Sequence, residues 1–82
     1  MAKKNESDYK VEKTIETLKI LEVLDFEPIS IDTVISRVGF IPTLERKLKP
    51  DAVRRILITL KLLRYAKQDE KTKLWSKGFK QL

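Results

Sequence analysis

The chain has 82 residues, of which 41% are hydrophobic and 37% charged, and its formal net charge at neutral pH is +6. These values are typical of one small, highly charged folded domain rather than a disordered segment. The sequence contains no cysteine and no histidine, which excludes disulfides, thiolate or imidazole metal sites, and catalysis by either group. We therefore expect neither an enzyme nor a bound metal or cofactor.

The positive charge is concentrated in the second half of the chain. Residues 1–42 hold six lysines and arginines against eight acids, a net charge of −2, whereas residues 43–82 hold twelve against four, a net charge of +8. Such a one-sided field favours a phosphate polymer or an acidic protein surface as partner, although solubility alone would also explain it. Residues 1–8 are polar and lack an apolar segment, so we expect a flexible tail, with no signal peptide or membrane anchor. We therefore expect a single domain over residues 9–82 and a cytoplasmic location.

Two amphipathic helices are expected in the first half. The first runs from about residue 9 to residue 25, with apolar residues at helical spacing. Ile20 and Val23 widen its apolar surface, which favours core packing and leaves open a homodimer through this helix. The second helix follows Pro28, with Ser30 as N-cap, and ends at Gly39, where a left-handed conformation costs glycine little. The apolar stripe of the first helix is Val11, Ile15, Leu18, Leu21 and Leu24.

The segment between the second and third helices contains one proline, Pro42, and the basic residues Arg46, Lys47 and Lys49. It is longer than a tight helix-turn-helix turn. A helical turn and a mobile loop close to a bound polymer both fit residues 41–50. The sequence does not decide between them.

The third helix and the residues after it define the fold class. Pro50 and Asp51 are typical of a helix start, with Asp51 able to cap the free backbone amides. Arg54, Arg55 and Lys61 fall outside the apolar stripe. Short runs around four central turn residues, 69–72, predict a two-stranded hairpin. The sequence thus predicts a mainly α winged helix-turn-helix fold, a three-helix bundle with a two-stranded wing. The expected buried stripe of the third helix is Val53, Ile56, Leu57, Leu60 and Leu63.

Three segments resemble the N-terminal winged helix of IclR-type transcription regulators: TIETLKILEVL, ISIDTVISRVGF, and AVRRILITLKLLRY with the later WSKG. The resemblance implies a third helix in the major groove with Arg55 near the DNA. Three features depart from it. Segment 41–51 is longer than in those regulators, and Arg64 replaces the usual glycine before the wing, so we expect a different turn there or one without a positive φ. We also expect no small-molecule effector domain after Leu82. The most specific matches are Val53, Arg55, Ile56, Leu57, Thr59, Leu60, Leu63 and Tyr65.

Each outward residue has an expected role on duplex DNA. The forked donors of Arg54 and Arg55 suit guanine edges or phosphate, and the other basic side chains suit phosphate. Ile58 lies beside both arginines and suits a thymine methyl group. Asp69 and Glu70 in the hairpin turn argue against deep insertion of its tip, and Trp75 is expected to anchor the hairpin. The expected DNA-binding residues are Arg46, Lys47, Lys49, Arg54, Arg55, Ile58, Lys61, Lys67, Lys71 and Lys73.

Two functions remain open on this basis. The first is a small DNA-binding protein that regulates transcription and acts as a dimer on paired half-sites. The alternative is a winged-helix interaction module that docks on an acidic protein, with Ile58 and Leu62 as its apolar anchor. Removing Arg54 and Arg55 should abolish the first activity, whereas polar substitutions of Ile58 and Leu62 should matter more for the second.

Overall fold

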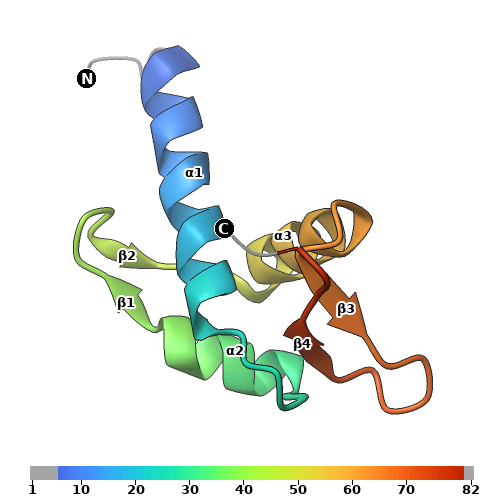
Figure 1. Ribbon diagram of the computed structural model, residues 1–82. Helices are drawn as coiled ribbons and strands as arrows, with labels where there is room; N and C mark the ends of the chain where they lie inside the picture. Colours follow the sequence, from blue (N-terminus) through green and yellow to red (C-terminus); the bar gives the residue numbers. More distant parts are fainter. Residues whose placement is uncertain (1–5, 81–82) are drawn as a thin grey trace.

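The computed structural model describes residues 6–80, which form three helices and two short antiparallel hairpins (Figure 1). Strand β1 pairs with β2, and β3 pairs with β4. The two hairpins lie on opposite sides of the helices (Figure 1). The expectation of a mainly helical domain with a small hairpin after the third helix is confirmed. The elements are α1 (Glu6–Val23), α2 (Ile31–Val38), β1 (Phe40–Ile41), β2 (Arg46–Lys47), α3 (Pro50–Leu62), β3 (Ala66–Gln68) and β4 (Trp75–Lys77).

Helix α1 begins earlier and ends earlier than its sequence pattern predicts. It starts at Glu6 and ends at Val23, so residues 6–8 of the expected flexible tail belong to the helix. The rest of that tail, residues 1–5, lies outside the described residues.

The predicted buried face of α1 was wrong in part: Leu24 is buried as expected, and Ile15 and Leu21 are half-buried against the core. The buried residues are Glu16 and Ile20 of α1 and Leu24 just after it, with 3%, 0% and 2% of their surface exposed, and their spacing of four residues places them on one side. Val11 and Leu18, which were expected inside, are 57% and 47% exposed. The helix carries apolar residues on two sides, so periodicity alone does not identify the side that faces the core.

Helix α2 begins as predicted, and the segment after it forms a hairpin. The Ser30 hydroxyl accepts the Thr33 backbone N–H at 3.1 Å, which confirms the N-cap. Gly39 has a positive φ of 55°, as expected, but its ψ of −148° is not that of the left-handed helix and leads the chain directly into β1. The sequence left residues 41–50 open between a helical turn and a loop. In the structure, residues 40–47 form the β1–β2 hairpin, in which Phe40 pairs with Lys47.

Helix α3 starts at Pro50, with Lys49 as an N-cap that makes no side-chain hydrogen bond. Asp51 was expected to cap the helix but lies within its first turn, where its carboxylate is 3.8 Å from the Arg54 guanidinium. The predicted inner stripe is confirmed except at Leu63, which is exposed because the helix has already ended at Leu62. The buried members are Val53, Ile56, Leu57 and Leu60.

The end of α3 uses a positive φ at a residue that is not glycine. Arg64 has a φ of 69°. Its N–H donates to the Lys61 carbonyl at 3.1 Å, and the Tyr65 N–H donates to the Leu60 carbonyl at 2.9 Å. This pair of bonds is the Schellman motif, in which glycine usually supplies the left-handed residue. Arg64 therefore makes the turn that glycine would make, despite the steric cost to its Cβ.

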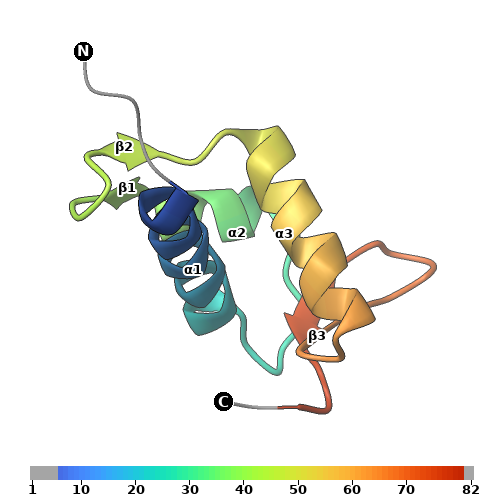
Figure 2. The same ribbon diagram turned by 90° about the horizontal axis from the view of Figure 1, so that it is seen from above.

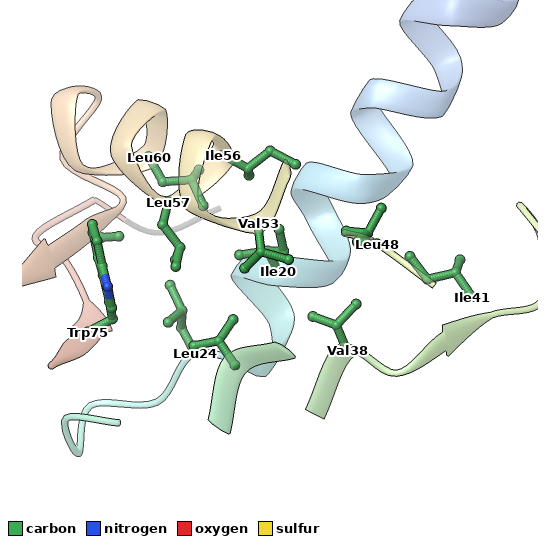
Figure 3. Packing of buried hydrophobic residues seen from close by; sticks show 12 residues of the cluster. Ile20, Leu24, Val38, Ile41, Leu48, Val53, Ile56, Leu57, Leu60 and Trp75 are labelled. Carbon is green, nitrogen blue, oxygen red and sulfur yellow. The ribbon is translucent and has the colours of Figure 1, made fainter. Parts of the chain in front are cut away.

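All three helices and both hairpins contribute to the core, which Figure 3 shows from close by. Ile20 of α1 packs near Val53 of α3 at its centre, Ile41 brings in the first hairpin, and Trp75 brings in the second. The Trp75 backbone also exchanges two hydrogen bonds with Ile29, at 2.6 and 2.8 Å, which joins β4 to the segment between α1 and α2. The expected anchoring role of Trp75 is confirmed.

Candidate nucleic-acid interface

The outward face of α3 combines positive and apolar side chains. Its residues recur at helical spacing opposite the buried stripe, and all are exposed. Ile58 lies between Arg54 and Arg55 when the helix is viewed end on, because successive residues are rotated by about 100°. The members of this outward face are Asp51, Arg54, Arg55, Ile58, Lys61 and Leu62.

A cleft of about 270 Å³ lies between α3, the first residue of α2 and the β3–β4 hairpin. Arg54 and Lys73 bring positive charge to it from two different elements, while Ile31, Ile58 and Trp75 provide apolar surface. Gln68 completes the lining. A strand of nucleic acid presents both deoxyribose and phosphate, so an apolar lining with two cations is chemically suited to it.

Gln68 was missed by the sequence reasoning. Its side-chain oxygen accepts from Lys61 Nζ at 3.5 Å, and its Nε2 donates to the Lys73 carbonyl at 3.2 Å, so it links α3 to both ends of the hairpin. Gln68 is also the cross-strand partner of Trp75. Alternation along β3 is the signal that would have found it, because buried Ala66 and Gln68 share one face of the strand.

Arg54 and Arg55 are adjacent in sequence but point toward different neighbours. Arg54 lines the cleft beside the hairpin, whereas Arg55 lines a second cleft, of about 260 Å³, between α3 and α1 with Lys13 and Thr17. The Arg55 Nε–H also donates to the Asp51 carbonyl at 3.4 Å. Both arginines were expected to make the same kind of DNA contact, but in the structure they line two different clefts.

The hairpin lysines are exposed. Lys67 lies on β3 and Lys71 lies in the turn, and both are exposed. Lys67 Nζ is 5.5 Å from the centre of the Phe79 ring. Lys73 has a φ of 61° and lies beside the cleft. Lys73 extends the positive surface of α3 onto the hairpin, while Lys67 lies on the opposite face of β3 from Gln68, beside Pro28 and Ser76.

The hairpin turn is built around the Asp69 carboxylate. One of its oxygens accepts the backbone N–H groups of Lys71 at 2.8 Å and Thr72 at 3.0 Å. These hydrogen bonds, from Thr72 first and Lys71 second, hold the pKa of Asp69 below its ordinary value, with a smaller contribution from the charge of Lys73. The carboxylate therefore shapes the turn that presents the lysines.

Arg46 takes a role in the fold. Its Nη2 donates to Glu16 Oε2 at 2.6 Å across 30 residues of sequence. Oε1 of the same buried carboxylate accepts no hydrogen bond among the described residues but lies 3.5 Å from Lys13 Nζ. A buried carboxylate is costly without a cation, so we assign Arg46 to Glu16 rather than to phosphate.

The remaining expected contacts lie on the other side of the molecule from the β3–β4 hairpin. Lys47 is exposed on β2 and lines a cleft of about 200 Å³ next to Ser36 and Gly39. Lys49 is exposed just before α3. The expected DNA-binding residues thus divide into a group around the α3 cleft and a separate pair near β2.

Within residues 6–80, no helix has the length and apolar character needed to cross a membrane. The same residues contain no group of three or more histidine, cysteine or acidic side chains that could hold a metal ion. A scan against protein-family models, a search of curated proteins and a search of solved structures each found no match.

Proposed function

We propose that this protein is a small winged helix-turn-helix protein that binds duplex DNA and regulates transcription. The observation that carries the proposal is the cleft between α3 and the β3–β4 hairpin, where Arg54 and Lys73 meet around an apolar lining. The resemblance of the sequence to the DNA-binding domain of IclR-type regulators supports the same conclusion.

In this proposal α3 enters the major groove, whose width admits one helix. Arg54 and Arg55 reach base edges or flanking phosphates with their forked donors. Ile58 contacts a thymine methyl group between them, and Lys61 binds phosphate from the last turn of the helix. These contacts combine affinity from charge with selection from the shape of the donors.

The β3–β4 hairpin then follows the DNA backbone beside the groove. A strand passing between α3 and the hairpin would place a phosphate between Arg54 and Lys73 and its sugar against Ile31. Lys67 and Lys71 would contact neighbouring phosphates. Because Asp69 is engaged by the turn, the lysines approach the backbone from the sides of the hairpin rather than by inserting its tip.

The test is a titration of random-sequence duplex DNA, followed by fluorescence anisotropy at several salt concentrations. We expect affinity to fall steeply with salt, because each neutralised phosphate releases counterions. Trp75 is the single tryptophan of the chain and lines the cleft, so its emission should also change at saturation. Absence of binding at low salt would contradict the proposal, as would full affinity in the double variant Arg54→Gln with Arg55→Gln.

A second candidate function is docking on an acidic protein. It is favoured by apolar side chains outside the outward face of α3: Leu63 and Phe79 are 52% and 81% exposed. Grouped exposed apolar side chains often mark protein interaction sites. The substitution Leu63→Ser separates the two functions, because Leu63 lies outside the outward face of α3, so the change should leave DNA affinity unchanged and weaken binding to a protein partner.

A further inference from the structure

The N-terminal half of α1 has little support from the rest of the chain, chiefly from the half-buried Ile15, which packs against the core. Residues 8–15 contain no buried side chain, and the first buried residue of the helix is Glu16. In Figure 1 the blue end of α1 stands clear of the other helices and of both hairpins, and Figure 2 shows the helix nearly end on beside α2 and α3. A helical segment this short is marginal in water without tertiary packing. We therefore expect the N-terminal half of α1 to be stabilised by packing against another surface.

The same helix presents a second apolar face. Val11, Ile15 and Leu18 recur at intervals of four and three residues, which places them on one side. Val11 and Leu18 are exposed, while Ile15 is half-buried and packs against the core. At about 100° per residue, Val11 and Leu18 lie roughly opposite Ile20, which faces the core. We call the exposed pair Val11 and Leu18 the outer stripe.

The outer stripe changes the expected location of a dimer contact. The sequence pointed to Ile20 and Val23 as surplus apolar surface on this helix. Ile20 is completely buried and Val23 is half-buried against the core, so neither offers a free surface. Any contact through α1 must therefore use the opposite side.

We propose that a second copy of this chain packs on the outer stripe, with the two α1 helices antiparallel. Asp8, Glu12 and Lys19 lie together on one flank of the stripe, as their helical spacing requires. When Val11 faces the partner's Leu18, Lys19 lies between the partner's Asp8 and the partner's Glu12. An antiparallel pair also opposes the two helix dipoles.

Two-fold symmetry makes every one of these contacts twice. The unsupported N-terminal half of each α1 lies along the C-terminal half of the other, which its own core holds in place through Ile20 and Leu24. The dimer therefore supplies the missing packing surface to both copies. This interface does not require DNA, so the test of the dimer does not depend on whether the proposed function is correct.

Cysteine cross-linking tests the register directly, because the chain contains no cysteine. Val11→Cys and Leu18→Cys are prepared as separate variants, mixed without DNA and oxidised. We expect a disulfide-linked dimer from the mixture and none from either variant alone. In the antiparallel pair, two copies of residue 11 are offset by about 10 Å along the axis, beyond the reach of a disulfide.

Two results would overturn the proposal. Cross-linking of Val11→Cys with itself would indicate a parallel pair, and a monomeric wild-type chain in sedimentation equilibrium at high micromolar concentration would remove the dimer altogether. A symmetric interface loses both valines at once, so Val11→Asp should raise the dimer dissociation constant by about a hundredfold. Phe40→Asp is the matched control, because Phe40 is as exposed as Val11 but lies on β1. It should leave the dimer unchanged.

The charges on the flank give an independent test. Lys19→Glu should weaken the dimer several-fold, because it places like charges side by side. The double variant Glu12→Lys with Lys19→Glu restores opposite charges across the interface and should recover affinity. Failure of the double variant to recover, with the helix content unchanged, would contradict the antiparallel arrangement.

Discussion

The two hairpins are of the same kind but use their basic residues differently. In the β1–β2 hairpin, the Arg46 guanidinium is held by the buried Glu16 carboxylate at 2.6 Å. In the β3–β4 hairpin, Trp75 and its backbone bonds to Ile29 provide the attachment, and the lysines remain exposed. Both hairpins also pack apolar residues into the core, so the difference lies in Arg46, whose charge is used by Glu16, whereas the lysines of the β3–β4 hairpin stay free for a ligand. Positive charge counted in a sequence is thus not all available for binding.

The largest expected effect concerns the apolar anchor of the β3–β4 hairpin. Trp75→Ala should lower the free energy of unfolding by about 3–5 kcal/mol, because it empties a large buried site. Phe40→Ala, which removes an exposed ring from the other hairpin, should change it little. Urea denaturation followed by circular dichroism measures both. Similar losses in the two variants would contradict the proposed difference in anchoring.

The ion pair of the β1–β2 hairpin should rank second. Arg46→Ala leaves the Glu16 carboxylate buried with only Lys13 nearby, and we expect a loss of about 1–3 kcal/mol, reduced because the Arg46 side chain is partly exposed. Lys47→Ala, one residue along the same strand, serves as the control. Replacing both partners, Glu16→Leu with Arg46→Leu, should recover most of the loss. Equal stability of the Arg46 and Lys47 variants would show that the pair does not hold the hairpin.

The turns that lead into the two hairpins should respond with opposite signs. Gly39 precedes β1 with a φ of 55°, and Arg64 precedes β3 with a φ of 69°. Gly39→Ala should destabilise the protein and Arg64→Gly should stabilise it, each by about 1 kcal/mol, because a Cβ is unfavourable at positive φ. Thermal unfolding of both variants at matched concentration measures the two shifts. Changes of the same sign would contradict the turn geometry.

The smallest effect concerns the pH dependence of the β3–β4 turn. The pKa of Asp69 is lowered in the folded state by hydrogen bonds from Thr72 and Lys71. Its stabilising contribution is therefore fully present above the unfolded pKa of about 3.9 and is lost as the pH falls through the lower folded value. The backbone amide shifts of Lys71 and Thr72, followed by NMR, should titrate together below that value. Titration at or above it would contradict the hydrogen bonding.

Sequence patterns within single elements allowed part of the fold to be predicted. Ser30 caps α2 through a contact three residues away, and the stripe from Val53 to Leu60 sets the inner side of α3. The inner side of α1 was not readable, because Glu16 becomes buried only through Arg46, 30 residues later. The β1–β2 hairpin has strands of two residues, too short to show alternation.

Part of the candidate site could likewise be predicted from the sequence, and part could not. The exposed positions of Arg54 and Lys73 follow from helix and hairpin patterns, but their meeting in one cleft depends on how α3 packs against β3 and β4. Gln68 carries no charge and was overlooked, although it joins Lys61 to Lys73. Alternation along β3 shows which face Gln68 lies on, but its contacts with Lys61 and Lys73 depend on how α3 packs against the hairpin.

The most direct test of the central claim compares two variants that remove the same charge from different places. Arg54→Gln with Lys73→Gln empties the α3 cleft of its cations, while Lys47→Gln with Lys49→Gln removes two exposed lysines near β2; each lowers the net charge from +6 by two. Both are titrated with duplex DNA across a range of salt concentrations. The account predicts that the first variant loses most of its affinity and that its salt slope falls by about one, because the phosphate held between Arg54 and Lys73 is lost and each lost phosphate contact removes about 0.9 from the slope. The second should keep nearly the wild-type slope. Equal losses in the two variants would show that net charge, rather than the cleft, determines binding.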